Sequence, residues 1–492
     1  MRALLLIFLF ALSSYSFSQV LDPDRYRETI FASSLETENI QYGTAPQWIW
    51  PNLDVDLFLD VFQPNGDLNP ERPLIIFAHQ GGFLYGNKDY DDITALCDSF
   101  ARMGYVTATI DYRKGYDPLE SDGAERAAYR AIQDGNAAVR YFKEYASIYD
   151  IDTNNIFFGG MSAGAFIALH VAYLDKEAER PASTYDMGLF KPDLGCLDCS
   201  GNSYTHTSQV KAVVDCWGGV LDSAVIEVGD VPVIIYHGTA DAVVPYTSGN
   251  IFGVPTMPVA YGASAIVNQC EAIGVPYEAT IVENGEHQLN GTSNGAWSGA
   301  PNSFWTDTLL PQTTDFLFEL IRPFPSKISP DTVYLGLNEI YTHQLVDDAN
   351  SQYLWTFDSG NIDELTNTNS SEIELKYVTP GNYDLEVIEF NHLLAASDTL
   401  KFHVVVDDDL GVDSESEFNL DIYPNPCHGE LYIASNVPID ELVIFNVDGK
   451  VIYSITEAVE NEMLDLSGFD SGIYFLKVRA ESQLITKKII KK

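Results

Sequence analysis

The stretch Gly160-Met161-Ser162-Ala163-Gly164 carries the residue with the clearest reactive chemistry in the chain. Two aromatic residues, Phe157 and Phe158, precede it, and a run of small residues follows it. A serine with glycines two positions to either side is typical of a strand–turn–helix elbow, which projects the serine hydroxyl above the edge of a sheet. The other interpretation is a glycine-rich turn with a bystander serine, so the rest of the chain must decide.

A nucleophilic serine needs a base and an acid that orients the base. His287 in "VENGEHQL" is the candidate base, because it follows Ser162 and the candidate acid Asp241 along the chain, in the order Ser, Asp, His. Asp241 in "PVIIYHGTADAVVP" is the favoured acid, since it lies just past an apolar run in a loop of small residues. Asp215, at the end of "VKAVVD", competes for the same role.

The third requirement is a set of N–H donors for the oxyanion that forms when the serine attacks. Gly81 and Gly82 in "AHQGGFLYG" can offer backbone N–H groups at close range, because they carry no side chain. The N–H of Ala163, directly after the serine, is a further donor candidate. The alternative is a plain Gly-Gly turn. The segment with Gly81 and Gly82 lies just after a predicted strand, and this position favours the oxyanion hole.

The elements that must position these residues alternate along the first two thirds of the chain. Apolar runs predict strands at 53–62, 73–79, 105–112, 155–160, 210–214, 232–237 and 277–282, and helical patterns lie near 91–102, 124–147, 259–274 and 305–321. This alternation predicts an α/β fold with a doubly wound, mostly parallel sheet and helices on both faces. The candidate residues then lie at the carboxyl ends of strands, where such sheets carry their sites.

With these residues in place, the region from residue 50 to about 322 resembles the α/β-hydrolase superfamily, near carboxylesterases, feruloyl and acetylxylan esterases and hormone-sensitive-lipase-like enzymes. The family's oxyanion motif H-G-G-G-[FW] stands here as His79-Gln80-Gly81-Gly82-Phe83, and its DYR motif as Asp111-Tyr112-Arg113. Its D-x-x-R-I-x-x-x-G-x-S-A-G pattern runs from Asp152 to Gly164. Two positions depart from the family, Gln80 for the first glycine and Asn155 for the usual arginine.

The chain changes character after this region. Residues 325–406 show short alternating apolar runs, which predict an all-β sandwich similar to Ig-like or PKD-like spacers. Residues 407–417 form an acidic linker, and residues 418–492 are again predicted to be β-rich, with a hairpin turn at Asp448-Gly449.

The segments "YPNP", "GELYI", "VDGKVIY" and "SGIYFLKV" within residues 418–492 resemble the type A C-terminal sorting domain of the type IX secretion system. The resemblance implies that the type IX machinery is a partner. It also implies export across the outer membrane, removal of this domain, and release or attachment at the cell surface.

Composition limits the partners further. The net charge of the 492 residues is −44, which argues against nucleic acid and anionic membrane surfaces as partners. Arg2 precedes an apolar run, Ala3–Leu12, that is too short to span a bilayer, and small residues follow it. Residues 1–18 are therefore predicted to be a secretory signal peptide, and we expect no integral membrane segment in the mature chain.

Six cysteines are present, and Cys196 and Cys199 form a C-x-x-C motif. No second pair or H-x-x-x-H pattern accompanies it, so a loop staple is favoured over a zinc site, although the pairing cannot be deduced. We expect neither a metal nor a cofactor.

Taken together, the sequence predicts a secreted serine ester hydrolase with a catalytic domain at 19–324 and a small-molecule or polymer-linked ester as substrate. The alternatives are a secreted serine peptidase of the same fold, a lipase or polyester hydrolase, and a non-catalytic adhesin. We expect the insert 175–209 and the loop 288–305 to shape the substrate pocket. Trp217, Trp297 and Trp305 are predicted on the catalytic side, where they would suit short-acyl or aromatic esters such as polysaccharide decorations.

Overall fold

The computed structural model describes residues 21–47, 53–188, 191–366, 368–407, 420–447, 449–456, 459–480 and 483–492. The predicted signal peptide and almost all of the predicted acidic linker lie outside these residues. The chain divides into two compact units. The first comprises the residues up to Val333, Ile340–Tyr377 and Asn382–Val404, and the second comprises Tyr334–Glu339, Val378–Gly381 and Val405–Lys492.

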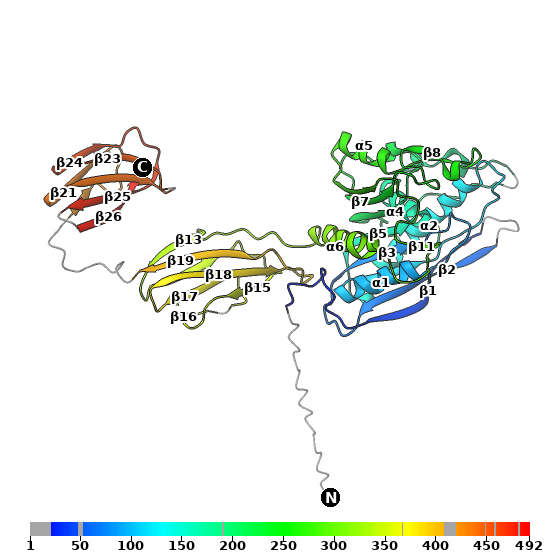
Figure 1. Ribbon diagram of the computed structural model, residues 1–492, viewed down its shortest axis with the longest axis horizontal. Coiled ribbons are helices and arrows are strands. Elements are labelled where there is room, and N and C mark those ends of the chain that lie inside the picture. Colours follow the sequence, from blue (N-terminus) through cyan, green and yellow to red (C-terminus); the bar gives the residue numbers. More distant parts are fainter. Residues whose placement is uncertain are drawn as a thin grey trace, which may run out of the picture. The chain divides into compact units, whose positions relative to one another are not determined.

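An eight-stranded sheet lies at the centre of the first unit, with the strand order β1-β2-β4-β3-β5-β6-β7-β10 (Figure 1). Its strands are β1 (Ser34–Pro46), β2 (Asp54–Pro64), β3 (Arg72–Ala78), β4 (Val106–Ile110), β5 (Ile151–Met161), β6 (Ala212–Cys216), β7 (Val233–Gly238) and β10 (Tyr277–Val282). All neighbours from β4 to β10 pair in parallel, while β2 is antiparallel to both β1 and β4. The predicted mostly parallel sheet is confirmed.

Helices cover both faces of this sheet, because its central strands are apolar on both sides. Along β3, Leu74, Ile76 and Ala78 join one buried cluster and Ile75 and Phe77 the other. The first cluster packs against α2 and α4, and the second against α1 and α6. The helices are α1 (Asp91–Met103), α2 (Gly123–Glu144), α3 (Ala146–Tyr149), α4 (Ala163–Tyr173), α5 (Ala263–Ile273) and α6 (Leu310–Glu319).

Short helical turns and strand pairs complete this region. They are η1 (Glu177–Glu179), η2 (Ala182–Thr184), η3 (Ser223–Val225), η4 (Ile251–Gly253), η5 (Trp305–Leu309), β8 (Ser248–Asn250), β9 (Val259–Tyr261), β11 (Thr292–Ser293) and β12 (Ala296–Trp297). None of the helices within the described residues combines the length and hydrophobicity that crossing a bilayer requires.

Two elements differ from the sequence prediction. Strand β1 was not predicted; its burial pattern is mostly exposed, so the apolar alternation that marks a strand is weak there. The helix predicted over 259–274 begins only at Ala263, because Val259–Tyr261 pairs with β8 instead. Gly262 is extended at this boundary, which lets the chain leave the strand pair and enter α5.

The predicted sandwich that follows the α/β region consists of two sheets, β13-β19-β18-β15 and β14-β17-β16. Ring contacts connect the two sheets, since the ring centroids of His343 in β14 and Phe402 in β19 lie 5.3 Å apart. The strands are β13 (Thr332–Gly336), β14 (Ile340–Gln344), β15 (Gln352–Thr356), β16 (Ile362–Glu364), β17 (Glu372–Tyr377), β18 (Gly381–Phe390) and β19 (Leu400–Asp407).

The loop 391–396 of this sandwich is buried against the α/β region that contains the eight-stranded sheet. Leu393 is 1% exposed and belongs to the same apolar cluster as Ile75 and Phe100. Its carbonyl oxygen accepts hydrogen bonds from Tyr26 Oη at 2.7 Å and Asn69 Nδ2 at 2.9 Å. Apolar packing and buried hydrogen bonds of this loop therefore attach the sandwich to the apolar cluster that includes residues of α1.

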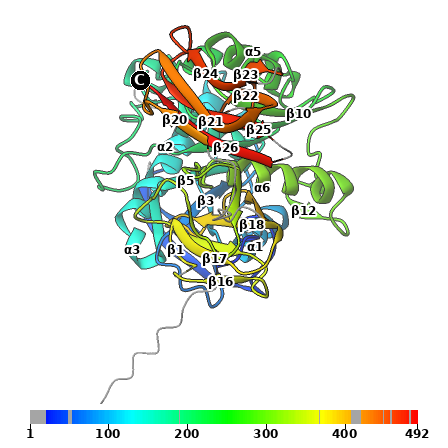
Figure 2. The ribbon, with the colours of Figure 1, turned by 90° about the vertical axis from the view of Figure 1, so that its left-hand side faces the viewer.

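The second unit contains the sheets β20-β21-β24 and β23-β22-β25-β26 (Figure 2). A small core that includes Leu431, Ile444 and Leu476 lies in this unit. The strands are β20 (Leu420–Tyr423), β21 (Glu430–Ile439), β22 (Glu441–Asn446), β23 (Val451–Ile455), β24 (Val459–Asp465), β25 (Gly472–Ala480) and β26 (Gln483–Lys491). The predicted hairpin joins β22 to β23, although Asp448 itself lies outside the described residues.

The buried loop generates a prediction about stability. We expect Leu393→Ala in the full chain to lower the free energy of unfolding of the first unit by about 2–4 kcal/mol, because it removes a leucine from a closed core. Amide hydrogen exchange of β3, which lies outside the sandwich, measures this effect. Leu365→Ala, which removes an exposed leucine of the sandwich, should leave β3 unchanged. Equal protection of β3 in both variants would show that the sandwich does not stabilise the α/β region.

Candidate active site

Ser162 lies on a strained turn between β5 and α4. Its backbone angles are φ 53° and ψ −115°, a region that a residue with a side chain adopts only where the surroundings force it. A Cβ at Gly160 would lie 2.3 Å from the backbone of Gly164, and one at Gly164 would lie 1.9 Å from the carbonyl oxygen of Ala78. The two glycines are therefore required by the close approach of α4 to β5 and β3, as the elbow motif predicts.

The side chains of Ser162, His287 and Asp241 form one hydrogen-bonded chain. His287 Nε2 lies 2.9 Å from Ser162 Oγ, and His287 Nδ1 lies 2.6 Å from Asp241 Oδ2. Ser162 and Asp241 are buried, and the side chain of His287 is 12% exposed. Ser162 and Asp241 are 125 and 46 positions from His287 in the sequence, yet all three meet at the carboxyl edge of the sheet.

Asp241 is held rigidly in the loop after β7. Its Oδ1 accepts the backbone N–H groups of Val243 at 2.7 Å and Val244 at 2.9 Å, which leaves Oδ2 for His287. His237 lies 3.4 Å from the same Oδ2, and burial lowers the pKa of its imidazole. The neutral His237 therefore adds no charge that would compete with His287 for the carboxylate.

Asp215 takes a different role in the structure. Its Oδ1 accepts the backbone N–H of Gly218 at 2.7 Å, and its Oδ2 finds no hydrogen-bond partner among the described residues. Burial raises the pKa of this carboxyl to about 7. The geometry favours Asp241 over Asp215 as the partner of His287, because Asp241 makes the short contact to Nδ1.

The loop after β3 lies beside the serine. Gly82 and Ala163 line the same cavity as Ser162, while Gly81 is absent from the described residues that line it. Gly81 instead forms the turn, where its carbonyl oxygen accepts from Leu84 and Tyr85. Ala163 is the first residue of α4, so its N–H has no acceptor within the helix. Gly82 and Ala163 are thus the better placed of the three predicted oxyanion donors.

The cavity beside Ser162 is apolar and small, about 30 Å³, which is room for about two water-sized groups. Its walls come from the loop after β3, from Tyr116 and helix α2, from the elbow and helix α4, from Leu221, and from the segment 243–258. The residues from the last segment are Val243, Val244, Ile251, Phe252, Met257 and Pro258. Sequence reasoning missed this segment; the one available signal was its position directly after Asp241.

The expected pocket walls prove to be wrong. No residue of 175–188, 191–209 or 288–305 lines this cavity. Of the three tryptophans, Trp217 and Trp305 are buried in the core below α1 and α6, and Trp297 packs edge-on against Trp305 at 5.2 Å. Trp217 does follow a strand end, but its ring is fully buried in the same apolar cluster as Phe316 and Leu317 of α6.

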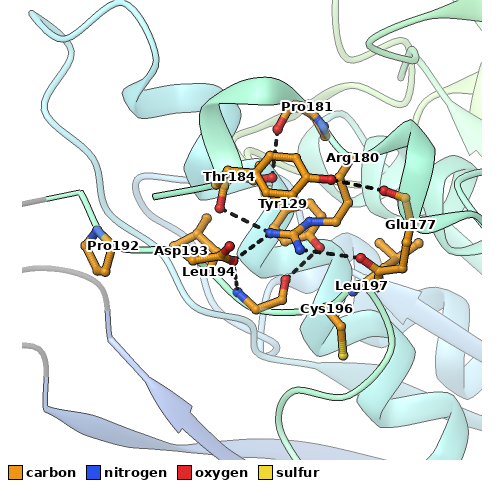
Figure 3. Close-up of polar contacts among 12 residues, drawn as sticks. Tyr129, Glu177, Arg180, Pro181, Thr184, Pro192, Asp193, Leu194, Cys196 and Leu197 are labelled. Carbon is orange, nitrogen blue, oxygen red and sulfur yellow. Dashed lines mark hydrogen bonds and ion pairs between the residues drawn. The ribbon is translucent and has the colours of Figure 1, made fainter. Parts of the chain in front are cut away.

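The insert after α4 is folded back onto itself and onto α2 (Figure 3). Arg180 binds Asp193 Oδ1 at 2.8 Å and lies 5.2 Å from the ring centroid of Tyr129. Tyr129 Oη donates to the carbonyl oxygen of Gly195 at 3.0 Å. Cys196 and Cys199 form a disulfide, so the C-x-x-C is a loop staple. Within the described residues, no group of three or more His, Cys, Asp or Glu side chains could hold a metal ion.

Two protein families match the chain. Residues 59–224 match the BD-FAE family, and residues 421–492 match the secretion system C-terminal sorting domain. These matches confirm both resemblances seen in the sequence, an esterase-like α/β-hydrolase region and a type IX sorting domain.

Curated relatives match only part of the hydrolase region. Gut esterase 1 of Caenorhabditis briggsae is 29% identical over 110 residues, which are 22% of this chain and 19% of the relative. An AB hydrolase superfamily protein of Schizosaccharomyces pombe is 30% identical over 153 residues, 30% of this chain and 40% of the relative. The chain thus spans less than half the length of either relative.

Solved structures of Thermogutta terrifontis esterase 2 are also similar to this chain. The form phosphorylated by paraoxon is 21% identical, with a TM-score of 0.41, and the match covers 56% of this chain and 94% of that one. The propionate-bound form is 20% identical, with a TM-score of 0.38, and the match covers 56% and 92%.

The burial of Asp215 generates a prediction about pH. The folded pKa of about 7 lies above the ordinary value of 3.8, so the folded chain binds the proton more tightly. The contribution of the Asp215 carboxyl to the free energy of unfolding is therefore fully present below pH 3.8, and it is lost as the pH rises to about 7. Asp215→Asn removes this loss. Relative to wild type, the variant should gain on the order of 4 kcal/mol in the free energy of unfolding between pH 4 and pH 8.

Urea denaturation of both proteins across this pH range measures the difference. Asp315→Asn changes the charge of an exposed residue in α6 and serves as the matched control. A difference between Asp215→Asn and wild type that does not vary with pH would contradict the prediction.

Proposed function

We propose that this protein is a secreted serine esterase that cleaves carboxylic esters through an acyl-enzyme on Ser162. The observation that carries the proposal is the hydrogen-bonded chain from Ser162 Oγ through His287 to Asp241, set beside a small apolar cavity. The match of residues 59–224 to the BD-FAE family supports the same reaction class.

In the first half of the reaction, Ser162 Oγ attacks the ester carbonyl carbon while His287 Nε2 takes the hydroxyl proton. Asp241 holds the proton of Nδ1 on its own side and stabilises the imidazolium that forms. The N–H groups of Gly82 and Ala163, with Gly81 shaping the turn, bind the oxyanion. His287 then returns the proton to the alcohol oxygen as the C–O bond breaks and the alcohol leaves.

The second half repeats these steps with water. His287 Nε2 takes a proton from a water molecule, whose oxygen attacks the acyl carbon on Ser162. The same N–H groups bind the second oxyanion, and the proton passes to Ser162 Oγ as the acyl bond breaks. The products are the carboxylic acid and the free enzyme, so no cofactor is needed.

The substrate we propose is a short-acyl or aromatic ester, such as a decoration on a polysaccharide. A cavity of about 30 Å³ suits an acyl group of a few carbon atoms, and Met257 and Phe252 close it on the side of segment 243–258. Leu84 and Tyr85 follow Phe83 in the loop after β3, and their exposed side chains, with that of Phe252, could offer apolar contacts to a larger group outside the cavity. A long acyl chain, by contrast, is too large for a cavity of this volume.

The place of action we propose is the cell surface or the medium. The C-terminal sorting domain at 421–492 indicates export through the type IX machinery. Removal of this domain after export, and release or surface attachment of the enzyme, are the parts of the proposal that follow from the resemblance.

Site-directed variants test the reaction. Ser162→Ala and His287→Ala should each lower kcat on p-nitrophenyl acetate by roughly 10³-fold or more, because the two side chains act as a unit. Asp241→Asn should cost roughly 10³–10⁴-fold through the wrong imidazole tautomer, whereas Asp215→Asn should stay within a few-fold. Far-ultraviolet circular dichroism verifies that each variant is folded. Greater damage from Asp215→Asn than from Asp241→Asn would reject the assignment of the acid.

Acyl-chain selectivity tests the cavity. We expect the kcat/KM of p-nitrophenyl esters to be highest between acetate and butyrate and to be low for palmitate. Met257→Ala should raise the ratio of hexanoate to acetate kcat/KM by roughly tenfold, because it enlarges the acyl site by several methylene volumes. Met187→Ala, which changes an exposed methionine, is the control. A maximum at long chains, with a rate jump at an emulsion interface, would favour a lipase.

A further inference from the structure

Gln80 is the position at which the oxyanion loop departs from the motif of similar hydrolases. The side chain is 1% exposed, so it does not reach solvent. Its Nε2 donates to Asp92 Oδ2 at 2.9 Å. The substitution of glutamine for glycine therefore adds a buried hydrogen bond that a glycine could not make.

Asp92 receives hydrogen bonds from a second loop as well. It lies in the first turn of α1 and is fully buried. Asn290 Nδ2 lies 3.0 Å and Thr292 Oγ1 lies 2.9 Å from the same Oδ2. Both residues belong to the loop that carries His287. The other oxygen, Oδ1, lies 2.9 Å from the backbone N–H of Ile93.

The elbow touches this cluster too. Asn290 Nδ2 lies 3.4 Å from Met161 Sδ, and Met161 directly precedes Ser162. The cluster of Gln80, Asp92, Asn290 and Thr292, which we call the Asp92 hub, thus contacts three segments that carry proposed reacting groups: the oxyanion loop, the loop of His287 and the elbow.

We propose that Asp92 is a positioning residue, which locks the oxyanion loop onto the loop of His287 and so fixes the distance between the oxyanion donors and the base. The inference rests on the proposed esterase function. Gln80 precedes Gly81 and Gly82 by one and two residues, and Asn290 follows His287 by three, so little chain separates the hub from the reacting groups.

A carboxylate suits this position because one of its oxygens can accept several hydrogen bonds at once. None of the four donors is charged, and burial raises the pKa of Asp92 to about 6. An asparagine would offer one oxygen and two N–H groups. Its single oxygen could accept hydrogen bonds either from Gln80 and the loop of His287 or from the Ile93 N–H, but not from both.

The first experiment compares Asp92→Asn with Asp98→Asn in the full chain. Asp98 lies on the same helix and accepts from Ser34, with no described bond to either site loop. We expect Asp92→Asn to lower kcat on p-nitrophenyl acetate at least tenfold with KM within twofold, and Asp98→Asn to change neither. Reaction to completion with a fluorophosphonate measures the fraction of protein molecules that carry a reactive serine. This fraction should equal that of the wild type in both variants.

Two outcomes overturn the proposal. One is an unchanged kcat in Asp92→Asn, and the other is a rise in KM without loss of kcat, which would point to substrate binding. A loss of titratable serine in proportion to kcat would mean that the variant misfolds, and the second experiment below then decides. If the proposed function itself fails, Ser162→Ala will retain activity, and that result is independent of any Asp92 variant.

A second experiment covers the case in which Asp92→Asn does not fold. Gln80→Leu and Asn290→Ala each remove one donor and leave Asp92 in place. If both loops are held through the same carboxylate, the double variant should lose clearly less kcat than the product of the two single losses. Losses that multiply would show that the two loops are positioned independently, and would overturn the hub.

Discussion

The close approach of helix α4 to the end of strand β3 is the constraint on which the rest of the site depends. Any Cβ at Gly164 would collide with the carbonyl oxygen of Ala78, so only glycine permits the approach. The approach brings the N–H of Ala163 beside the loop that follows β3, and it forces Ser162 into its positive φ. Strain at a single residue is thus maintained by the packing of a helix against a fully buried sheet.

The polar residues around the oxyanion loop serve mainly to hold that loop. Tyr112 stacks on His79 at 4.3 Å, and its hydroxyl donates to the carbonyl oxygen of His79 at 2.9 Å. Arg113 binds the buried Asp134 of α2 at 2.8 Å. The Asp-Tyr-Arg motif therefore acts at a distance from the reaction, by fastening β4 and α2 to the loop. The proposed Asp92 hub does the same from the opposite side.

The sandwich after the hydrolase region is less independent than its sequence suggests. Its loop 391–396 carries Leu393 and Ala395 into the core below α1, and Asn391 Nδ2 donates to the carbonyl oxygen of Ile321 at 2.7 Å. A spacer that merely separates two domains needs no such contacts. The sorting domain has its own apolar core, which is consistent with a part that can be removed without disturbing the rest.

The sequence by itself determined most of the alternation of strands and helices along the chain, because apolar runs and helical periodicity are local properties; β1 and the strand Val259–Tyr261 are exceptions. It also named Ser162, Asp241 and His287, since elbow glycines and strand-end positions can be read without a structure. Their catalytic roles stay a proposal, but the structure does bring their side chains into one hydrogen-bonded chain. The sequence favoured Asp241 as the acid but kept Asp215 as a competitor, because both follow apolar strands.

Only the tertiary structure decided which side chains wall the cavity. Segment 243–258 reaches Gly82 from a distant part of the chain, and no local pattern records that contact. The same holds for Trp217 and Trp305, whose burial depends on the layer formed by α1 and α6 rather than on their neighbours in sequence. Gln80 looked like a defect in a motif until Asp92, Asn290 and Thr292 were found around it. Contacts between residues far apart in sequence arise from packing, and packing is what a linear pattern does not contain.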